Sequence, residues 1–269
     1  MPAQEVKSMR YAHPSTASGP AQLPPSAPPG MRRAMRGGIF GNYVNQFDIF
    51  LPVIALTPAA AHLFGSENLV GNAGLIFVAT LLGRPIGAAI FGPISDPIGR
   101  TATTKVALTG VALTTLLIAL VPSHAVFGAG SLLLILALRF VGGIFLGGEY
   151  TSAVPLAMEW SKPERRGLVS GLIMWMSPWA NATIAGLVFV LHGTLGAASY
   201  NAWGWRIPFL LGAVLAFGML AYYRARVQDF PTWTHPPTPH ERAEGNSYRR
   251  TPPGAVAGIH SDERHVVAH

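Results

Sequence analysis

The fold class of this chain follows from residues 131–160, which read SLLLILALRFVGGIFLGGEYTSAVPLAMEW. Apolar residues occupy every face of this stretch and do not alternate with polar ones. A helix needs about 20 such residues to cross a hydrocarbon core of about 30 Å, whereas a membrane strand needs only about 9–11 alternating residues. The stretch therefore predicts one transmembrane helix.

Comparable apolar stretches lie on both sides of it, so the sequence predicts an all-α membrane protein with six transmembrane helices. Prolines inside these stretches are tolerated, because neighbouring helices satisfy the freed carbonyl groups, and we expect kinks there. The predicted spans are Gly38–Phe64, Leu69–Ile94, Thr103–Val121, Ser131–Trp160, Leu168–His192 and Trp205–Tyr223, and the prolines are Pro52, Pro58, Pro85, Pro155 and Pro178.

The composition agrees with a membrane protein. Of the 269 residues, 50% are apolar and 12% are charged, which excludes a typical soluble enzyme. The absence of cysteine excludes disulfides, iron–sulfur clusters and thiolate zinc sites. The sequence offers no His/Glu metal constellation, no intramembrane serine with a base and no phosphate-binding loop, so we expect neither an enzyme nor a cofactor or metal site.

Basic residues set the expected orientation, because cytoplasmic loops are enriched in Lys and Arg. They gather before the first span and after the second, fourth and sixth, and the opposite loops hold almost none apart from Arg206. We therefore expect both termini in the cytoplasm and a multi-pass protein in the lipid bilayer of the cell membrane. This topology explains the net charge of +7 without a nucleic-acid partner. The basic residues are Arg32, Arg33, Arg36, Arg100, Lys105, Lys162, Arg165, Arg166, Arg224 and Arg226.

Polar segments flank the membrane domain. Residues 1–37 begin with a stretch rich in Pro, Ser and Ala and predict a disordered, basic cytoplasmic leader. Residues 38–226 form the predicted six-helix transmembrane domain. Residues 227–269 are rich in Pro, His, Arg and Glu and predict a cytoplasmic tail that is also disordered.

Four ionisable residues lie inside the predicted spans, where a charge at the bilayer centre costs at least about 2.5–3.5 kcal/mol. Two of them, Asp48 and Arg139, fall near the midplane when depth is counted at about 1.5 Å per residue. We interpret them as a proton-binding carboxylate and a movable guanidinium that sets its proton affinity and binds an anionic substrate. A fixed structural ion pair is the alternative.

The other two charges are Arg84 and Glu149, which fall toward the cytoplasmic ends of the second and fourth spans by the same count. They are expected to pair with each other or to extend toward the membrane surface. A structural role and a role in proton or substrate binding are both open for this pair.

Glycines four residues apart occur twice within the spans, as Gly83 with Gly87 and as Gly143 with Gly147. Small residues at this spacing let membrane helices approach closely. The pattern predicts that the fourth helix crosses a neighbour tightly near its charged residues. Ordinary packing explains these glycines better than a direct role in transport.

Several motifs resemble one family. Residues 84–100, RPIGAAIFGPISDPIGR, resemble the signature between the second and third helices of the major facilitator superfamily, most closely in its metabolite:proton symporter branch. Residues 139–150, RFVGGIFLGGEY, resemble the fourth helix of that branch. Glu159 with Arg166 resembles the acidic and basic pair of the next cytoplasmic loop, and Gly-Asn and Phe-Asp within residues 41–48 are similar to the opening motif.

The resemblance covers about residues 38–230 and implies the amino-terminal half of this fold, built from two repeats of three helices. It implies symport of a small organic acid or related metabolite with protons, along a path lined by the first, second, fourth and fifth helices. Alternating access would come from rocking of two six-helix halves. A cytoplasmic gate that closes the outward-facing state would be formed by Gly92, Asp96, Gly99, Arg100, Glu159 and Arg166.

The sequence also departs from the family pattern. Pro97 and Thr101 stand at gate positions that are usually basic. Asn45 and Gln46 stand where the branch commonly has Glu and Trp. The usual preferences for substrate and proton therefore do not carry over directly to this chain.

Length is the largest departure, because the family has twelve helices and this sequence predicts six. We expect a truncated half, which leaves one wall of a central cavity unbuilt and charges exposed unless a partner covers them. Two alternatives follow. Either a second six-helix half or a homodimer completes the cavity, or the chain is a non-transporting remnant or an interaction subunit of a full-length transporter.

Overall fold

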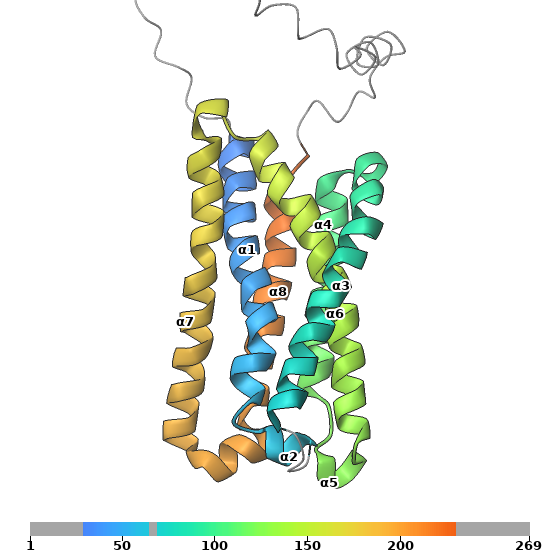
Figure 1. Cartoon of the computed structure of the whole chain (residues 1–269). Helices are drawn as coiled ribbons and strands as arrows, with labels where there is room; N and C mark the ends of the chain where they lie inside the picture. Colours follow the sequence, from blue (N-terminus) through green and yellow to red (C-terminus); the bar gives the residue numbers. More distant parts are fainter. Residues whose placement is uncertain (1–28, 65–68, 230–269) are drawn as a thin grey trace, which may run out of the picture.

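The computed structural model describes residues 29–64 and 69–229, and these residues form helices and short connections without a strand (Figure 1). Six long helices cross the molecule, joined by short helical segments at their ends. The helices are α1 (Pro29–Leu56), α2 (Ala60–Phe64), α3 (Leu69–Ile98), α4 (Arg100–Ala119), α5 (His124–Phe127), α6 (Gly130–Glu159), α7 (Arg166–Ser199) and α8 (Arg206–Arg226). The predicted leader and tail lie outside the described residues, apart from residues 29–37 and 227–229.

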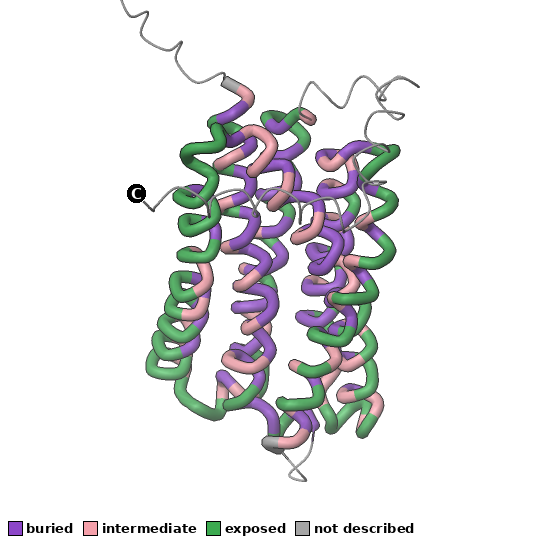
Figure 2. The backbone as a smooth tube through the Cα atoms, turned by 45° about the horizontal axis from the view of Figure 1, so that its top comes forward, coloured by how far each residue is buried: buried purple, intermediate pink, exposed green. Residues whose placement is uncertain are grey.

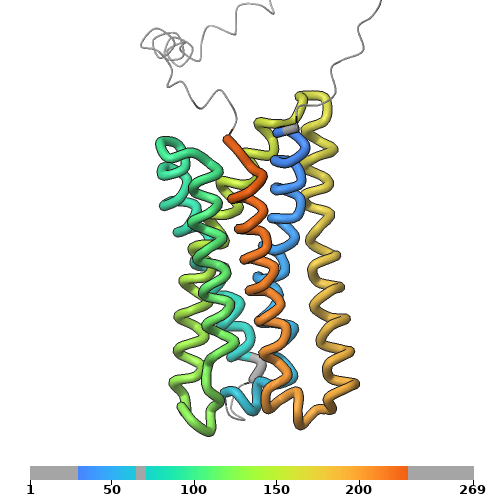
Figure 3. Tube along the Cα trace, turned by 180° about the vertical axis from the view of Figure 1, so that it is seen from behind, coloured from blue at the N-terminus to red at the C-terminus, as the bar shows by residue number. Residues whose placement is uncertain are grey.

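Six of these helices are long and apolar enough to cross a membrane, which confirms the predicted all-α membrane fold. They alternate in direction, so α1 begins and α8 ends at the same end of the bundle (Figures 1 and 3). We call this the basic end, because it carries Arg32, Arg33, Arg36, Arg224 and Arg226. The loops that were used to predict orientation also lie at this end, while the side of the membrane that it faces stays a prediction.

The first helix begins at Pro29, earlier than the predicted start at Gly38 and within the segment that was expected to be a disordered leader. The residues between these points include Met, Arg and Ala, which favour helix strongly. A hydropathy criterion places the start of the span after the arginines. Arginine is nevertheless a good helix former, so the helix extends further toward the N-terminus than the apolar stretch does. The first turns of α1 therefore carry the arginines of the basic end.

Two other span ends differ from the prediction. The first predicted span, Gly38–Phe64, divides at Thr57–Ala59 into α1 and α2, because Pro58 lacks an amide hydrogen and its ring disfavours helix in the residue before it. The fifth span continues past His192 to Ser199, with a kink at Gly196 (φ +75°) and a π-helical turn at Tyr200–Gly204. Glycine reaches this positive φ without the steric cost of a side chain.

The glycine pairs on α3 and α6 meet each other. A Cβ atom built on Gly87 would overlap the backbone oxygen of Ile144, and one built on Gly83 would overlap that of Phe140. In the other direction, a Cβ on Gly143 would overlap the backbone oxygen of Thr80. The two backbones thus pack directly, as predicted from the four-residue spacing, and van der Waals contact between them holds the helices together.

The buried residues follow the inner faces of α1, α4, α6 and α8, whereas α7 is the most exposed of the six (Figure 2). Phe47 and Ile49 are buried on α1, on either side of Asp48, and pack in two separate apolar clusters. Asp48 therefore sits in the middle of the helix packing. This placement fixes the position of its carboxylate.

Candidate functional site

Asp48 of α1 and Arg139 of α6 form a buried ion pair. Arg139 Nη1 lies 2.7 Å from Asp48 Oδ2, and the side chains of Arg139 and Asp48 are 1% and 4% exposed. The same nitrogen also donates to the backbone oxygen of Asp48 at 3.1 Å. The pairing predicted from equal depth in the membrane is therefore present, and neither charge faces the surface of the bundle.

Two further helices complete the surroundings of this pair. Thr115 of α4 donates a hydrogen bond from its hydroxyl group to Asp48 Oδ1. The ring of Phe209 on α8 lies 5.2 Å from the guanidinium carbon of Arg139, at a distance suited to a cation–π contact. Asp48 thus accepts hydrogen bonds on both of its carboxylate oxygens.

Two hydrogen-bond donors of Arg139 are unpaired. Its Nε and Nη2 atoms are buried and have no hydrogen-bond partner among the described residues. Buried donors are normally satisfied, because leaving one unpaired costs about 1–3 kcal/mol. The guanidinium is therefore held by one of its edges only, and the remaining donors suit a second anionic or carbonyl oxygen.

A second polar network lies nearer the basic end, but its two charges do not pair directly. Asn45 of α1 stands between them and donates to Glu149 Oε2 at 2.6 Å. Arg84 of α3 donates to Asn45 Oδ1 at 3.4 Å, and its guanidinium carbon lies 5.6 Å from the centre of the Tyr150 ring. Arg84 is half-buried, whereas Glu149 is only 2% exposed. Arg84 is thus the more accessible of the two intramembrane arginines named here.

Gly41 makes room for Glu149. A Cβ atom at Gly41 would lie 2.9 Å from Glu149 Oε1, so a larger side chain on α1 would displace this carboxylate. Asn45 follows one turn later and reaches the other oxygen. The glycine and the amide of α1 together define the position of Glu149 on α6.

Thr115 is a site residue that sequence reasoning missed, and Asn45 was noted only as a departure from the family pattern, not as a partner of Arg84 and Glu149. Asn45 precedes Asp48 by three positions, and residues three apart share one face of a helix, so this spacing could have placed Asn45 beside α6. Thr115 carried no such signal, because threonine is common in membrane helices and its partner lies on another helix. Only the packing of α4 against α1 shows that its hydroxyl meets Asp48.

The predicted gate residues are brought together only in part. Arg100 Nε lies 2.7 Å from Glu159 Oε1 at the basic end, and the two side chains are 18% and 26% exposed. Asp96 and Arg166 are exposed, and neither forms an ion pair with a described residue. Gly92 lies in α3 with open space where a Cβ would stand. One ion pair therefore joins two of the predicted gate residues.

Gly99 has a different role, which the structure shows at the start of α4. Its φ of +97° marks the break between α3 and α4. Asp229, from the segment after α8, accepts a hydrogen bond at 2.8 Å from the backbone N–H of Thr101 in the first turn of α4. A Cβ at Gly99 would lie 2.8 Å from Asp229 Oδ2. Asp229 thus caps α4 from a distant part of the sequence.

No metal site accompanies these charges within the described ranges. Among residues 29–64 and 69–229, no group of three or more His, Cys, Asp and Glu side chains is placed to hold a metal ion. The site consists of two buried polar networks on α1 and α6, about one turn apart along α1, and an ion pair at the basic end.

Comparisons with known proteins agree on one family. The family model described as Major Facilitator Superfamily matches residues 38–260. The chain is 30% identical over 205 residues to the inner membrane metabolite transport protein YhjE of Escherichia coli (strain K12), covering 75% of this chain and 46% of that protein. It is 31% identical over 197 residues to the citrate-proton symporter of Klebsiella pneumoniae, covering 72% and 44% of the two chains.

The fold is also similar to that of a solved transporter structure. The crystal structure of a D-xylose-proton symporter superimposes with a TM-score of 0.68 at 18% sequence identity, over 82% of this chain and 53% of that one. The match to each curated relative named above spans less than half of that relative's length. With six membrane-spanning helices, the matched motifs and the family model in agreement, this multi-pass membrane chain belongs to the major facilitator superfamily.

Proposed function

We propose that this six-helix unit is one half of a proton-coupled secondary transporter that moves a small organic acid or related metabolite across the cell membrane. The observation that carries the proposal is the buried ion pair of Asp48 and Arg139. A pair buried for stability alone is usually no better than apolar residues of the same volume. The citrate-proton symporter among the relatives supports the substrate class.

The proposed proton step begins at Asp48. Protonation neutralises its carboxylate and weakens its bond to Arg139, because a neutral acid attracts the guanidinium far less than an anion does. Thr115 keeps the carboxyl group in place, since its hydroxyl can donate to a neutral acid as well as to a carboxylate. Arg139 Nη1 then keeps only its hydrogen bond to the backbone oxygen of Asp48, and Nε and Nη2 are unpaired beside it.

The freed arginine supplies the coupling between proton and substrate. A carboxylate substrate accepts two parallel hydrogen bonds from one guanidinium edge, a geometry that suits arginine better than lysine. Proton binding at Asp48 therefore raises the affinity of Arg139 for an anion, and the anion in turn raises the proton affinity of Asp48. Each solute favours the loading of the other, which is the requirement for symport.

Arg84 is the proposed first contact for the anion. It is half-buried, while Arg139 is 1% exposed and reached only after rearrangement. The Arg84 guanidinium donates one hydrogen bond of 3.4 Å to Asn45. Glu149, which is bound to the other side of the Asn45 amide, attracts it only by charge. Such a weakly held cation is able to turn toward a substrate without breaking a strong ion pair.

The Arg100–Glu159 pair is the proposed gate contact. Exposed ion pairs contribute about 0–1 kcal/mol, so this contact biases two conformations and still breaks in every cycle. The proposed partner is a second six-helix unit, from another polypeptide or from a second copy, which covers the face where Arg84 is accessible.

Uptake measurements test the function. The chain is inserted into proteoliposomes alone and together with the carboxy-terminal half of the matched citrate-proton symporter, and uptake of labelled carboxylates is followed under an imposed pH gradient. We expect gradient-driven uptake that Asp48→Asn abolishes. Glu164→Gln is the matched control, because this exposed carboxylate lies in the loop before α7.

The outcomes of these measurements separate the alternatives. Uptake by the chain alone indicates a self-assembling half, and uptake only with the added half indicates a dependence on a partner. Correctly inserted protein without uptake in either arrangement, or uptake that survives Asp48→Asn, contradicts the proposal and favours a non-transporting remnant or interaction subunit.

A further inference from the structure

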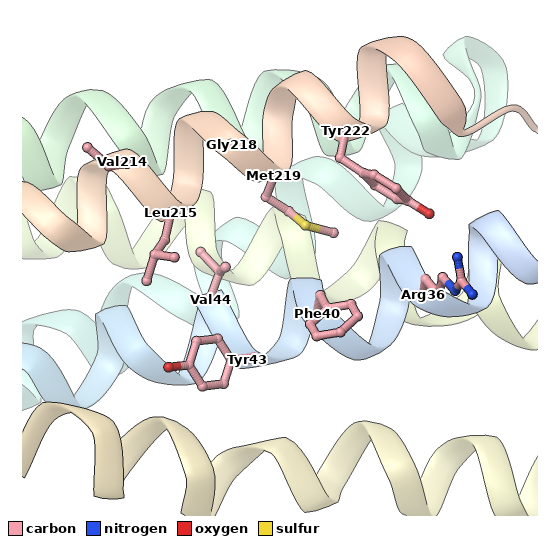
Figure 4. A pocket seen from close by; sticks show the side chains of 9 residues that line it. All are labelled: Arg36, Phe40, Tyr43, Val44, Val214, Leu215, Gly218, Met219 and Tyr222. Atoms are coloured by element: carbon pink, nitrogen blue, oxygen red, sulfur yellow. The ribbon is translucent and has the colours of Figure 1, made fainter. Parts of the chain in front are cut away.

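A groove of about 840 Å³ lies between α1 and α8, and none of the four intramembrane charges of the candidate site lines it. Its walls are almost entirely apolar and include Phe40, Tyr43 and Val44 from α1 and Leu215 and Met219 from α8 (Figure 4). Its volume is within the range of about 300–1,000 Å³ that is typical of small-molecule pockets. The groove belongs to the membrane-spanning length of both helices.

Gly218 on α8 borders the groove. A Cβ atom at this position would meet no other atom within 4 Å, so a larger side chain there would extend into open space. Phe40 and Val214 border the opening and are 56% and 65% exposed. Such large exposed apolar side chains along a membrane helix contact lipid chains favourably.

Charge is confined to one end of the groove. Figure 4 shows Arg36 and Tyr222 at the same end, with Val214 at the other. Tyr222 donates from its hydroxyl group to the backbone oxygen of Arg33 at 3.0 Å, which ties α8 to α1 at this end. Arg36 is exposed and forms no ion pair with a described residue.

The surroundings of Arg36 are also cationic. Arg32 and Arg33 precede it on α1, and Arg224 and Arg226 end the adjacent α8. No acidic residue lines the groove, and the single acidic residue of α1 is Asp48, which is buried against Arg139. An apolar slot that ends in a cluster of arginines complements a molecule with a long hydrocarbon chain and an anionic head.

The groove is lined by α1 and α8, whereas Arg84 lies on α3. Helix α3, which carries Arg84, lies in front in Figure 1, whereas α8 lies in front when the molecule is seen from behind in Figure 3. A second six-helix unit that covers Arg84 therefore leaves the α8 side in contact with the bilayer. We propose that this groove binds one acyl chain of an anionic phospholipid, whose phosphate group is bound by Arg36.

Arginine suits this role because its guanidinium forms two parallel hydrogen bonds with a phosphate group. Basic pockets between transmembrane helices are known to hold anionic lipid head groups. The acyl chain fills the space beside Gly218, where the side chains of α1 and α8 leave a gap. The lipid then acts as a spacer that fixes the distance between α1 and α8.

Native mass spectrometry of the purified chain tests this site without reference to transport. Phosphatidylglycerol or phosphatidylcholine is titrated into the protein in detergent, and the dissociation constant of the first lipid adduct is measured. We expect phosphatidylglycerol to bind more tightly than phosphatidylcholine. Arg36→Gln should weaken phosphatidylglycerol binding about fivefold and phosphatidylcholine binding less, because the choline cation of the second lipid offsets the charge of its phosphate.

Filling the groove gives a second, independent variant. Gly218→Leu should weaken both lipids, because its side chain occupies the space proposed for the acyl chain, and the open surroundings of Gly218 accommodate it. Matched controls are Arg165→Gln, an exposed arginine in the loop before α7, and Gly186→Leu, an exposed glycine of α7 with equally open surroundings. Both controls should bind as the wild type does.

Two results overturn the proposal. One is equal weakening by Arg36→Gln and Arg165→Gln, which would indicate unspecific attraction to the basic end. The other is unchanged binding in Gly218→Leu, which would place the lipid elsewhere. If Gly218→Leu is not monodisperse, the comparison of Arg36→Gln with Arg165→Gln tests the proposal by itself. Both arginines are exposed, so neither substitution disturbs the packing of the protein. Loss of uptake with intact lipid binding would contradict the proposed transport and leave this site standing.

Discussion

Arg139 on α6 binds Asp48 on α1 across 91 positions of sequence, with Nη1 and Oδ2 2.7 Å apart and both side chains nearly inaccessible. Four of the six membrane helices meet at this point, because Thr115 on α4 binds the other carboxylate oxygen and the Phe209 ring on α8 lies beside the guanidinium. The contact therefore has a structural consequence that is independent of any transport. It joins the two helices whose polar faces form the candidate site.

The ion pair predicts that substitutions of its two residues have non-additive effects on the free energy of unfolding. Asp48→Asn or Arg139→Gln alone should lower the free energy of unfolding by about 3–5 kcal/mol, because each leaves one buried charge unpaired. The double variant should lose less free energy of unfolding than the two single variants lose together, because no uncompensated charge remains. Chemical unfolding in detergent micelles, followed by circular dichroism, measures all four proteins of the cycle. Strict additivity would show that the two side chains do not interact.

The glycine contact between α3 and α6 predicts a position-dependent effect of one substitution. Gly87→Leu should destabilise the protein by about 1–3 kcal/mol or more, because its side chain would overlap the backbone of Ile144. Gly92→Leu on the same helix should change stability by less than about 0.5 kcal/mol, since its surroundings are open. Thermal unfolding of the two variants compares them directly. Similar losses at both positions would contradict the close helix contact.

The capping of α4 predicts a role for a residue outside the helices. Asp229→Ala should lower stability by about 0.5–2 kcal/mol, as the loss of other helix caps does, because the N–H of Thr101 loses its acceptor. Gln228→Ala is the matched control, because its exposed side chain forms no hydrogen bond with a described residue. Hydrogen exchange at Thr101 reports the same contact locally. Unchanged exchange in Asp229→Ala would rule the cap out.

Two buried tyrosines predict opposite results for the same change. Tyr200→Phe should cost about 0.5–1.5 kcal/mol, because the Tyr200 hydroxyl group donates to the backbone oxygen of Ala55 at 2.9 Å. Tyr223→Phe should be neutral or stabilising, because the buried Tyr223 hydroxyl group has no hydrogen-bond partner among the described residues. Denaturant midpoints of the two variants give the comparison. A larger loss for Tyr223→Phe would contradict this assignment.

The sequence by itself determined the features that depend on one helix at a time. Apolar length fixed the six spans, since the hydrocarbon core demands about 20 residues per helix. Depth along each helix matched Asp48 with Arg139, and four-residue spacing identified the glycines at which α3 and α6 touch. Membership of the family followed from motifs that lie in order along the chain. Each of these signals is a property of linear position.

Only the tertiary structure decided which side chains meet between helices. Asn45 stands between Arg84 and Glu149, Thr115 reaches Asp48, and Asp229 returns to cap α4. The reason is geometric: these contacts depend on the rotation and axial shift of one helix against another, which hydropathy and spacing do not specify. The groove beside Gly218 has the same origin. A glycine leaves a gap only when the facing helix does not fill it, and that is a property of the packed bundle.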